Sequence, residues 1–168
     1  MLDRDLLSTY LQDHLAGATA GTELAKRAAA QNRSSELGTI LSELAAEIEE
    51  DRETLIEVMD SLEVGRDRIK ELGAWTGEKL GRLKLNGRLL SYSPLSRLLE
   101  LEGLSLGIDG KRSLWRSLQR VAPGEPRLRR FDFRALAERA AKQRRRVEAQ
   151  RLKAAETAFG DRASSKAR

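Results

Sequence analysis

Hydrophobic residues recur at intervals of three and four positions along four long stretches of the chain. This spacing places apolar side chains on one face of an α-helix. The four stretches cover residues 3–28, 35–63, 94–121 and 132–159. Ser93 followed by Pro94 is a typical start for the third helix, and Gly160 typically lies just beyond the end of a helix such as the fourth. The pattern predicts an all-α protein made of four long helices.

The third stretch contains three glycines, Gly103, Gly107 and Gly110, which allow two interpretations. Each glycine inside a helix costs about 1 kcal/mol relative to alanine, so the helix could break near Gly107 and Gly110. Spacings of four and three residues instead place the three glycines on one face, where two backbones could approach closely. Gly17 and Gly21 offer a similar face on the first helix. We expect the third helix to be continuous.

The connections between the helices differ in length. Short turns join the first helix to the second and the third to the fourth, whereas residues 64–93 join the second to the third. A short connection makes neighbouring helices antiparallel, and so long a connection can cross the whole length of a bundle. This crossover also contains a shorter amphipathic helix with Trp75 and Leu83. We expect residues 1–160 to form one domain and residues 161–168 to form a flexible tail.

This helix order, with one long crossover between the second and third helices, resembles the ferritin-like superfamily. The resemblance covers residues 3–159 and also rests on two short motifs, Asp13-His14 and Leu99-Glu100-Leu101-Glu102. It implies a ferritin-like four-helix bundle that binds metal through core carboxylates and histidines and handles oxygen. Such proteins carry a Glu on each of two helices and Glu-x-x-His on each of the other two.

The chain departs from this ligand pattern on the first two helices. Its one histidine, His14, occupies the inward position of the first helix where the family has Glu, so no Glu-x-x-His is present. On the second helix, Glu47 is followed by Glu50 where the family has His, and Asp51 also faces inward.

The other two helices differ from each other. Glu102, or else Glu100, matches the Glu that the family has on the third helix. The middle of the fourth helix carries Gln143, Arg144, Arg145 and Arg146. Arginine is always charged and is not a metal ligand, so the fourth helix lacks the ligands of the family.

Four of these residues define a predicted buried polar layer near the helix midpoints: His14, Asp51, Glu102 and Arg144. Charges in a core are costly unless they are paired, so one interpretation is an ion-pair network in which Arg144 neutralises the carboxylates. A second is a metal site formed by His14, Glu47, Asp51 and Glu102. In a third, Arg144 extends outward and no layer forms. We expect the ion-pair network, and no stoichiometric metal or other cofactor.

Charge is distributed unevenly along the chain, although the net charge is only +5. Residues 1–63 contain 5 Lys and Arg against 14 Asp and Glu, whereas residues 122–168 contain 14 against 6. We expect the acidic first hairpin to attract the basic second hairpin. The basic runs at residues 127–130 and 142–146 could also bind nucleic acid or an anionic surface, but no aromatic residues alternate with them for base stacking. A solvated face complementary to the acidic hairpin is therefore favoured.

The remaining composition excludes several classes of protein. Without cysteine, the chain has no disulfide, thiolate or cysteine-based metal site. No apolar run approaches the roughly 20 residues of a membrane span, and the acidic start lacks the apolar segment of a secretion signal, so we expect a cytoplasmic protein.

The sequence predicts a non-enzymatic helical-bundle protein, a homodimer that acts through partners, with residues 64–93 near the interface or on the flank of the bundle. No nucleophile motif or glycine-rich phosphate loop argues for an enzyme. The alternatives are a ferritin-like metal-binding or oxygen-handling protein, and a binder of nucleic acid or anionic surfaces through the basic C-terminal helix.

Overall fold

The computed structural model describes residues 3–65 and 92–160. The described residues form four long helices and no strand: α1 (Arg4–Gln31), α2 (Glu36–Ser61), α4 (Pro94–Val121) and α5 (Phe133–Phe159). Two short 3-10 helices, η1 (Ala122–Gly124) and η2 (Pro126–Leu128), connect α4 to α5. The prediction of an all-α protein with four long helices is confirmed. Two predicted features, most of the crossover at residues 64–93 and the tail at residues 161–168, lie outside the described residues.

Each long helix begins at a side chain that caps its first turn. Asp3 accepts hydrogen bonds from the backbone N–H groups of Asp5 and Leu6, and Asp132 accepts one from that of Ala135. Ser35 and Ser93 cap α2 and α4 in the same way. Such caps satisfy N–H groups that have no partner within the helix, so they fix where each helix starts.

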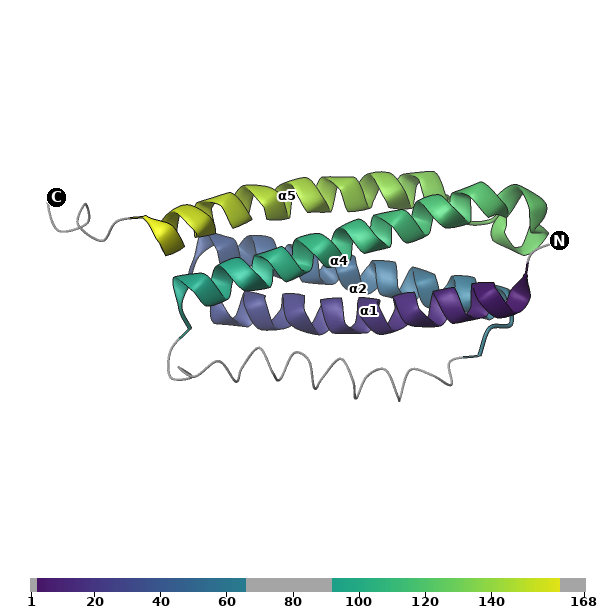
Figure 1. Ribbon diagram of the computed structural model, residues 1–168, viewed down its shortest axis with the longest axis horizontal. Coiled ribbons are helices and arrows are strands. Elements are labelled where there is room, and N and C mark those ends of the chain that lie inside the picture. The colour runs from purple at the N-terminus through teal and green to yellow at the C-terminus, as the bar shows by residue number, and fades with distance from the viewer. Residues whose placement is uncertain (1–2, 66–91, 161–168) are drawn as a thin grey trace, which may run out of the picture.

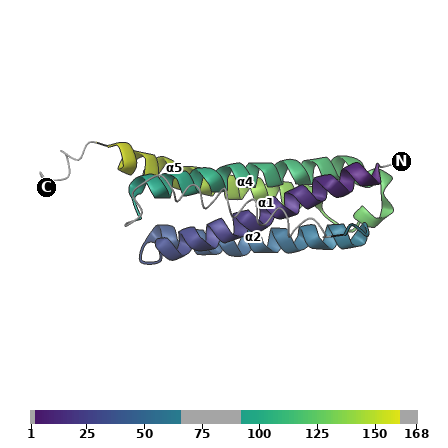
Figure 2. The same cartoon turned by 60° about the horizontal axis from the view of Figure 1, so that its bottom comes forward.

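The helices form a bundle in which every contact between long helices is antiparallel (Figures 1 and 2). Helix α1 packs against α2 and α4, and α5 packs against α4 and, less closely, against α2. Helices α1 and α5 run in one direction, and α2 and α4 run in the other. Figure 1 shows that α2 ends at one end of the bundle and that α4 begins at the opposite end. No helix in the described part of the chain has the length and hydrophobicity needed to span a membrane.

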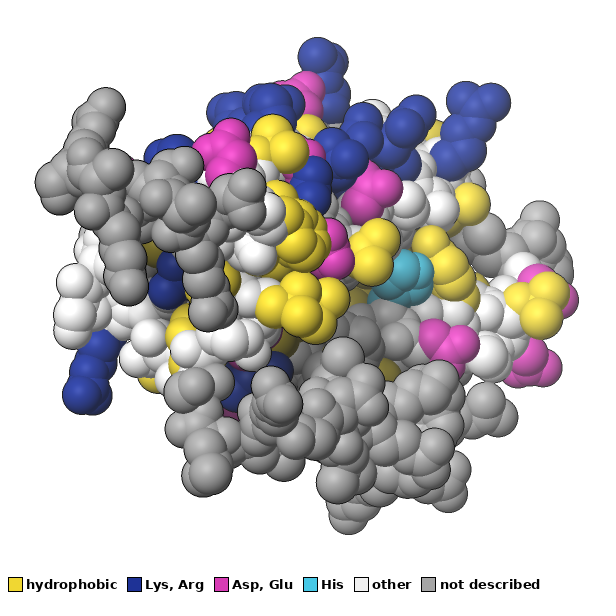
Figure 3. Space-filling model, turned by 60° about the vertical axis from the view of Figure 1, so that its left-hand side comes forward, with side chains coloured by type: hydrophobic (Ala, Val, Ile, Leu, Met, Phe, Trp, Pro, Cys, Tyr) yellow, Lys and Arg dark blue, Asp and Glu magenta, His cyan; other side chains and the backbone are white. Residues whose placement is uncertain are grey.

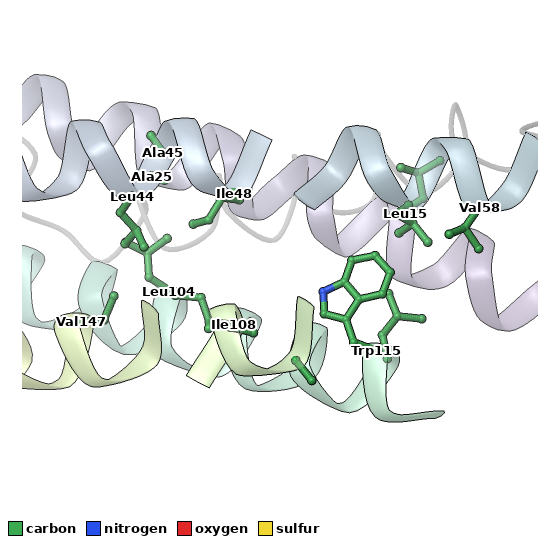
Figure 4. Close-up of a cluster of buried hydrophobic side chains, with 14 of the residues drawn as sticks. Leu15, Ala25, Leu44, Ala45, Ile48, Val58, Leu104, Ile108, Trp115 and Val147 are labelled. Atoms are coloured by element: carbon green, nitrogen blue, oxygen red, sulfur yellow. The ribbon is translucent and has the colours of Figure 1, made fainter. Parts of the chain in front are cut away.

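Leucine and alanine side chains from all four helices fill the core (Figure 4). The largest buried side chain is Trp115 of α4, which is fully buried and stacks on Phe133 of α5 with 6.2 Å between the ring centroids. Helix α5 contributes mostly small residues to the core, such as Ala137 and Ala140. Its attachment to the bundle therefore depends on more than apolar contact.

Ion pairs join α5 to α2, where the backbones approach each other over only a short stretch. Arg146 pairs with Glu43 at 2.8 Å and also with Glu47, and Arg139 pairs with Glu50 at 3.1 Å. Long side chains of opposite charge thus bridge these helices. The attraction expected between an acidic and a basic hairpin is realised in these contacts.

Helix α4 is continuous through its three glycines, as expected from their shared face. The predicted close approach to α1 occurs at one of them only. A Cβ atom on Gly103 would lie 3.1 Å from the Leu24 side chain, whereas one on Gly17, Gly21 or Gly107 would meet no atom of the described residues within 4 Å. The expectation of close backbone packing was wrong over most of this face, and no described side chain fills the space between the glycines.

Candidate functional site

A buried ion cluster centres on Asp51 of α2, whose relative exposure is 1 %. Its carboxylate accepts hydrogen bonds from Lys111 of α4 (Nζ to Oδ2, 2.5 Å) and from Gln143 of α5 (Nε2 to Oδ2, 3.1 Å). Arg139 of α5 donates to the other carboxylate oxygen. Lys111 also donates to the Gln143 side-chain carbonyl at 2.7 Å. The cluster therefore ties three helices together at mid-bundle.

The environment of Lys111 shows how the cluster balances charge. Burial lowers the pKa of the Lys111 ammonium, and the neighbouring Asp51 carboxylate partly offsets that effect. A buried charge is tolerated when an opposite charge and hydrogen bonds compensate for its lost hydration. Both conditions hold here, because Lys111 and Asp51 each have further polar partners.

The structure separates the four residues of the predicted polar layer. Asp51 lies in the cluster, but Arg144 does not: its Nε lies 3.6 Å from Asp109, and the two side chains are 46 % and 52 % exposed. Glu102 is 42 % exposed and lies 3.6 Å from Arg151. His14 of α1 lines the same cleft as Asp51 but is not bonded to it. Lys111 and Arg139, rather than Arg144, supply the positive charges that pair with the buried Asp51 carboxylate.

The sequence predicted that Arg144 faces the core at mid-α5, but Gln143 does so instead. Helix geometry explains this difference. Both positions fall three or four residues from the buried Ala140 and Val147, so the spacing alone permits either to face inward. The neutral amide costs less to bury than a guanidinium, and Gln143 is fully buried while Arg144 is exposed.

The residues proposed as metal ligands do not converge. Glu47 pairs with Arg146, Glu102 lies beside Arg151, and Asp51 is held by its three donors. Within residues 3–65 and 92–160, no group of three His, Asp or Glu side chains is placed to hold a metal ion. This donor set does not fit a ferritin-like metal centre.

A cleft of about 420 Å³ opens beside the cluster, between α1, α2 and α4. We call it the α1/α4 cleft. Five glycines line it, and two of them, Gly17 and Gly107, are exposed at its rim: Gly17, Gly21, Gly103, Gly107 and Gly110. Its floor is buried and mainly apolar, formed by Ile48, Leu55, Leu104, Ile108, Leu114 and Trp115. Because the glycines lack side chains, no side chain of residues 3–65 and 92–160 fills the space between α1 and α4 above this floor.

Two ring side chains, those of Trp115 and His14, are among the residues that line the cleft. The indole Nε1 of Trp115 is buried and has no hydrogen-bond acceptor among the described residues. In Figure 4 this nitrogen points toward the side where Ile48 and Ile108 lie, both of which line the cleft. The His14 ring packs edge-on against Tyr10, with centroids 4.5 Å apart, and Figure 3 shows it among hydrophobic side chains. Burial lowers the pKa of His14, so its imidazole is neutral at pH 7.

Sequence reasoning missed Lys111 and Trp115 as site residues. The spacing of Leu104, Ile108, Lys111 and Trp115 follows one face of α4, with Lys111 as the only charged member. A lysine between inward apolar residues was therefore the signal available in the sequence.

Comparisons with known proteins add no functional assignment. No protein-family model, curated protein or solved structure matches the chain. The chemistry of the cluster and the cleft therefore carries the functional argument.

Proposed function

We propose that this protein is a non-enzymatic helical bundle that binds a small, largely apolar molecule in the α1/α4 cleft. The observation that carries this proposal is the cleft itself, whose floor consists of buried apolar side chains and whose walls on α1 and α4 carry glycines. The volume and apolar floor of the cleft are also typical of small-molecule sites.

The polar groups beside the cleft favour binding over catalysis. Asp51 and Lys111 are hydrogen-bonded to each other and to Gln143, so neither is free to accept or donate a proton. His14 makes no hydrogen bond within the described residues, and it therefore lacks the partner that orients the imidazole of a general base. The cluster instead forms a polar wall in which each charged side chain has a partner of opposite charge.

We also propose a ferritin-like topology, with residues 64–93 as the crossover. Support comes from the placement of the described helices, since α2 ends at one end of the bundle and α4 begins at the other. The topology does not bring a metal site with it, because arginines of α5 engage Glu47 and Glu102. Elemental analysis of the purified protein should find no stoichiometric iron, manganese or zinc. One or two ions per chain, lost on replacing Glu47 and Glu102 by Ala, would favour the metal-binding alternative.

Nucleic acid is not a partner in this proposal. Figure 3 shows Lys and Arg side chains gathered at the top of the molecule, where α5 runs in Figure 1. Carboxylates lie within ion-pair distance of five arginines on this helix: Arg134, Arg139, Arg144, Arg146 and Arg151. Much of the positive charge is thus compensated within the bundle rather than presented to phosphates.

A titration with the neutral, apolar fluorophore N-phenyl-1-naphthylamine tests the proposed function. We expect saturable binding of one molecule per chain. Gly17→Leu with Gly107→Leu should abolish it, because both new side chains occupy the rim of the cleft, where a Cβ atom meets no described atom within 4 Å. Ala30→Leu with Ala46→Leu is the matched control, since both alanines are exposed and lie outside the cleft lining. Equal binding by the two double variants would contradict the proposal.

A further inference from the structure

The charged side chains that line the α1/α4 cleft are unequally compensated. Four of the described lining residues carry a charge at pH 7: Asp13, Asp51, Arg52 and Lys111. Lys111 pairs with Asp51 at 2.5 Å, and Arg52 lies against two carboxylates of its own helix. The Asp13 carboxylate has no cationic partner among the described residues. The uncompensated charge in the described part of the cleft wall is therefore negative.

Asp13 lies at the rim of the cleft, beside the apolar floor. Its side chain is exposed, so a ligand charge that meets it would keep part of its hydration. The Tyr10 hydroxyl of α1 donates to Ser117 of α4 at 3.3 Å, and because the two helices are antiparallel, the next turn places Asp13 opposite Leu114. Leu114 and Leu55 are both 1 % exposed and belong to the floor. This part of the cleft therefore suits a molecule with a charged end at the rim and an apolar body on the floor.

Two ring side chains near Asp13 also favour a positive charge. The Tyr10 and His14 rings both line the cleft, and aromatic rings attract cations over their faces. Burial lowers the pKa of His14, so its imidazole is neutral at pH 7 and does not repel a cation. Figure 3 shows the His14 ring at the molecular surface, where a ligand can reach it.

From this distribution of charge, and on the basis of the proposed function, we infer that the ligand of the α1/α4 cleft is a hydrophobic amine, with an apolar body and one protonated nitrogen. The ammonium group pairs with the Asp13 carboxylate at the rim, beside the Tyr10 and His14 rings. The apolar body lies on the floor of the cleft. An anion would instead meet the negative charge of Asp13 and no uncompensated cation among the described lining residues. Asp13 thus sets the preference of the site for the charge of its ligand.

Isothermal titration calorimetry with three naphthalene compounds tests this inference. At pH 7, 1-naphthylmethylamine is a cation, 1-naphthalenemethanol is neutral and 1-naphthoate is an anion, while the apolar body stays the same. We expect the amine to bind in a 1:1 ratio and about two- to fivefold more tightly than the alcohol, the effect of one exposed ion pair. The anion should bind least tightly. Because salt screens exposed charges, the advantage of the amine should shrink at about 1 M ionic strength.

The variant Asp13→Asn removes the charge and keeps the size of the side chain. It should lower the affinity for the amine to that for the alcohol and leave the affinity for the alcohol unchanged. Circular dichroism should show an unchanged fold, because Asp13 pairs with no described residue. Glu23→Gln is the matched control, since Glu23 is an exposed carboxylate on the same helix and lies outside the described cleft lining. This variant should keep the preference for the amine.

The outcomes separate this inference from the proposed function. The ligand class is wrong if the alcohol binds as tightly as the amine, if Asp13→Asn keeps the preference, or if Glu23→Gln reduces it equally. In each of these cases the cleft still binds N-phenyl-1-naphthylamine. If neither the naphthalene compounds nor the fluorophore binds, or if Gly17→Leu with Gly107→Leu blocks none of them, the site itself is wrong and both proposals fail.

Discussion

The carboxylate of Asp51 lies where α2, α4 and α5 meet, and donors from two of these helices surround it. Its partner Lys111 is 12 % exposed, so removing either charge leaves the other in a poorly hydrated place. The single position of Asp51 thus influences the packing of three helices. Asp109, which lies near Arg112 and Arg144 on the surface, provides a contrast in the same protein.

Replacing Asp51 by Ala should therefore destabilise the fold far more than replacing Asp109 by Ala. Loss of one member of a buried ion pair typically costs about 3–5 kcal/mol, whereas an exposed pair contributes about 0–1 kcal/mol. Urea unfolding followed by circular dichroism gives both free energies of unfolding. Equal and small losses in the two variants would show that the cluster does not stabilise the bundle.

His14 should make the stability depend on pH in the mildly acidic range. Burial holds the pKa of His14 below its usual value of 6.5, so folding opposes protonation of the ring. The contribution is fully present above pH 6.5 and is lost as the pH falls through the lower pKa of the folded state. The urea concentration at the unfolding midpoint should therefore be lower at pH 5.5 than at pH 7.5. His14→Gln should make this difference smaller. An unchanged pH profile in the variant would rule out His14 as its source.

At the scale of the helices, much of the fold could be predicted because the signals are local. Apolar spacing and capping residues such as Ser93 and Asp132 predicted limits close to those of α4 and α5. The identity of the buried residue at mid-α5 could not be settled this way, since Gln143 and Arg144 fit the same spacing. The choice depends on Lys111 and Asp51, which belong to other helices.

The α1/α4 cleft could not be predicted from the sequence, for a related reason. The sequence shows glycine faces on α1 and α4, but it does not show how far apart the two helices lie. That distance is set by large side chains elsewhere in the interface, such as Leu24 against Gly103 and the buried Trp115. The same glycine pattern is compatible with close packing or with an open cleft, and non-local packing decides between them.

Substitutions at two helical glycines should have opposite effects on stability. Gly107→Ala should stabilise the protein by up to about 1 kcal/mol, because alanine favours the helix and its Cβ meets no atom of the described part of the chain within 4 Å. Gly38→Ala should destabilise it by about 1–3 kcal/mol, because its Cβ would lie 2.1 Å from the backbone oxygen of Asn32. Thermal unfolding measures both effects. A destabilising Gly107→Ala would mean that the cleft is already filled.

For the whole molecule, we propose that the protein forms a homodimer and that one face of α4 contributes to the interface between the two copies. The predicted contacts through Trp75 and Leu83 lie outside the described residues. In the described part, three leucines spaced by four and seven residues lie on one side of α4 and are exposed: Leu95 by 48 %, Leu99 by 46 % and Leu106 by 76 %. Exposed apolar side chains that share one face are typical of a contact surface.

Light scattering coupled to size exclusion should therefore give twice the chain mass of 18.8 kDa. Leu99→Glu with Leu106→Glu should shift the protein toward the monomer, because the new charges would be buried in the interface. Ala30→Glu, an exposed position on α1, is the control. A monomer at every accessible concentration would refute the dimer, and a dimer unaffected by the leucine substitutions would refute this interface.

The measurement that tests the binding site most directly is the indole N–H signal of Trp115 in a ¹⁵N–¹H correlation spectrum. The chain has only two tryptophans, so Trp75→Phe leaves one indole signal and assigns it. On titration with N-phenyl-1-naphthylamine, the Trp115 signal should shift and saturate at one molecule per chain, because Trp115 lines the floor of the cleft. Backbone signals of Gly17 and Gly107 should move with the same affinity. An indole signal that stays in place while an apolar molecule binds elsewhere would contradict the proposed site.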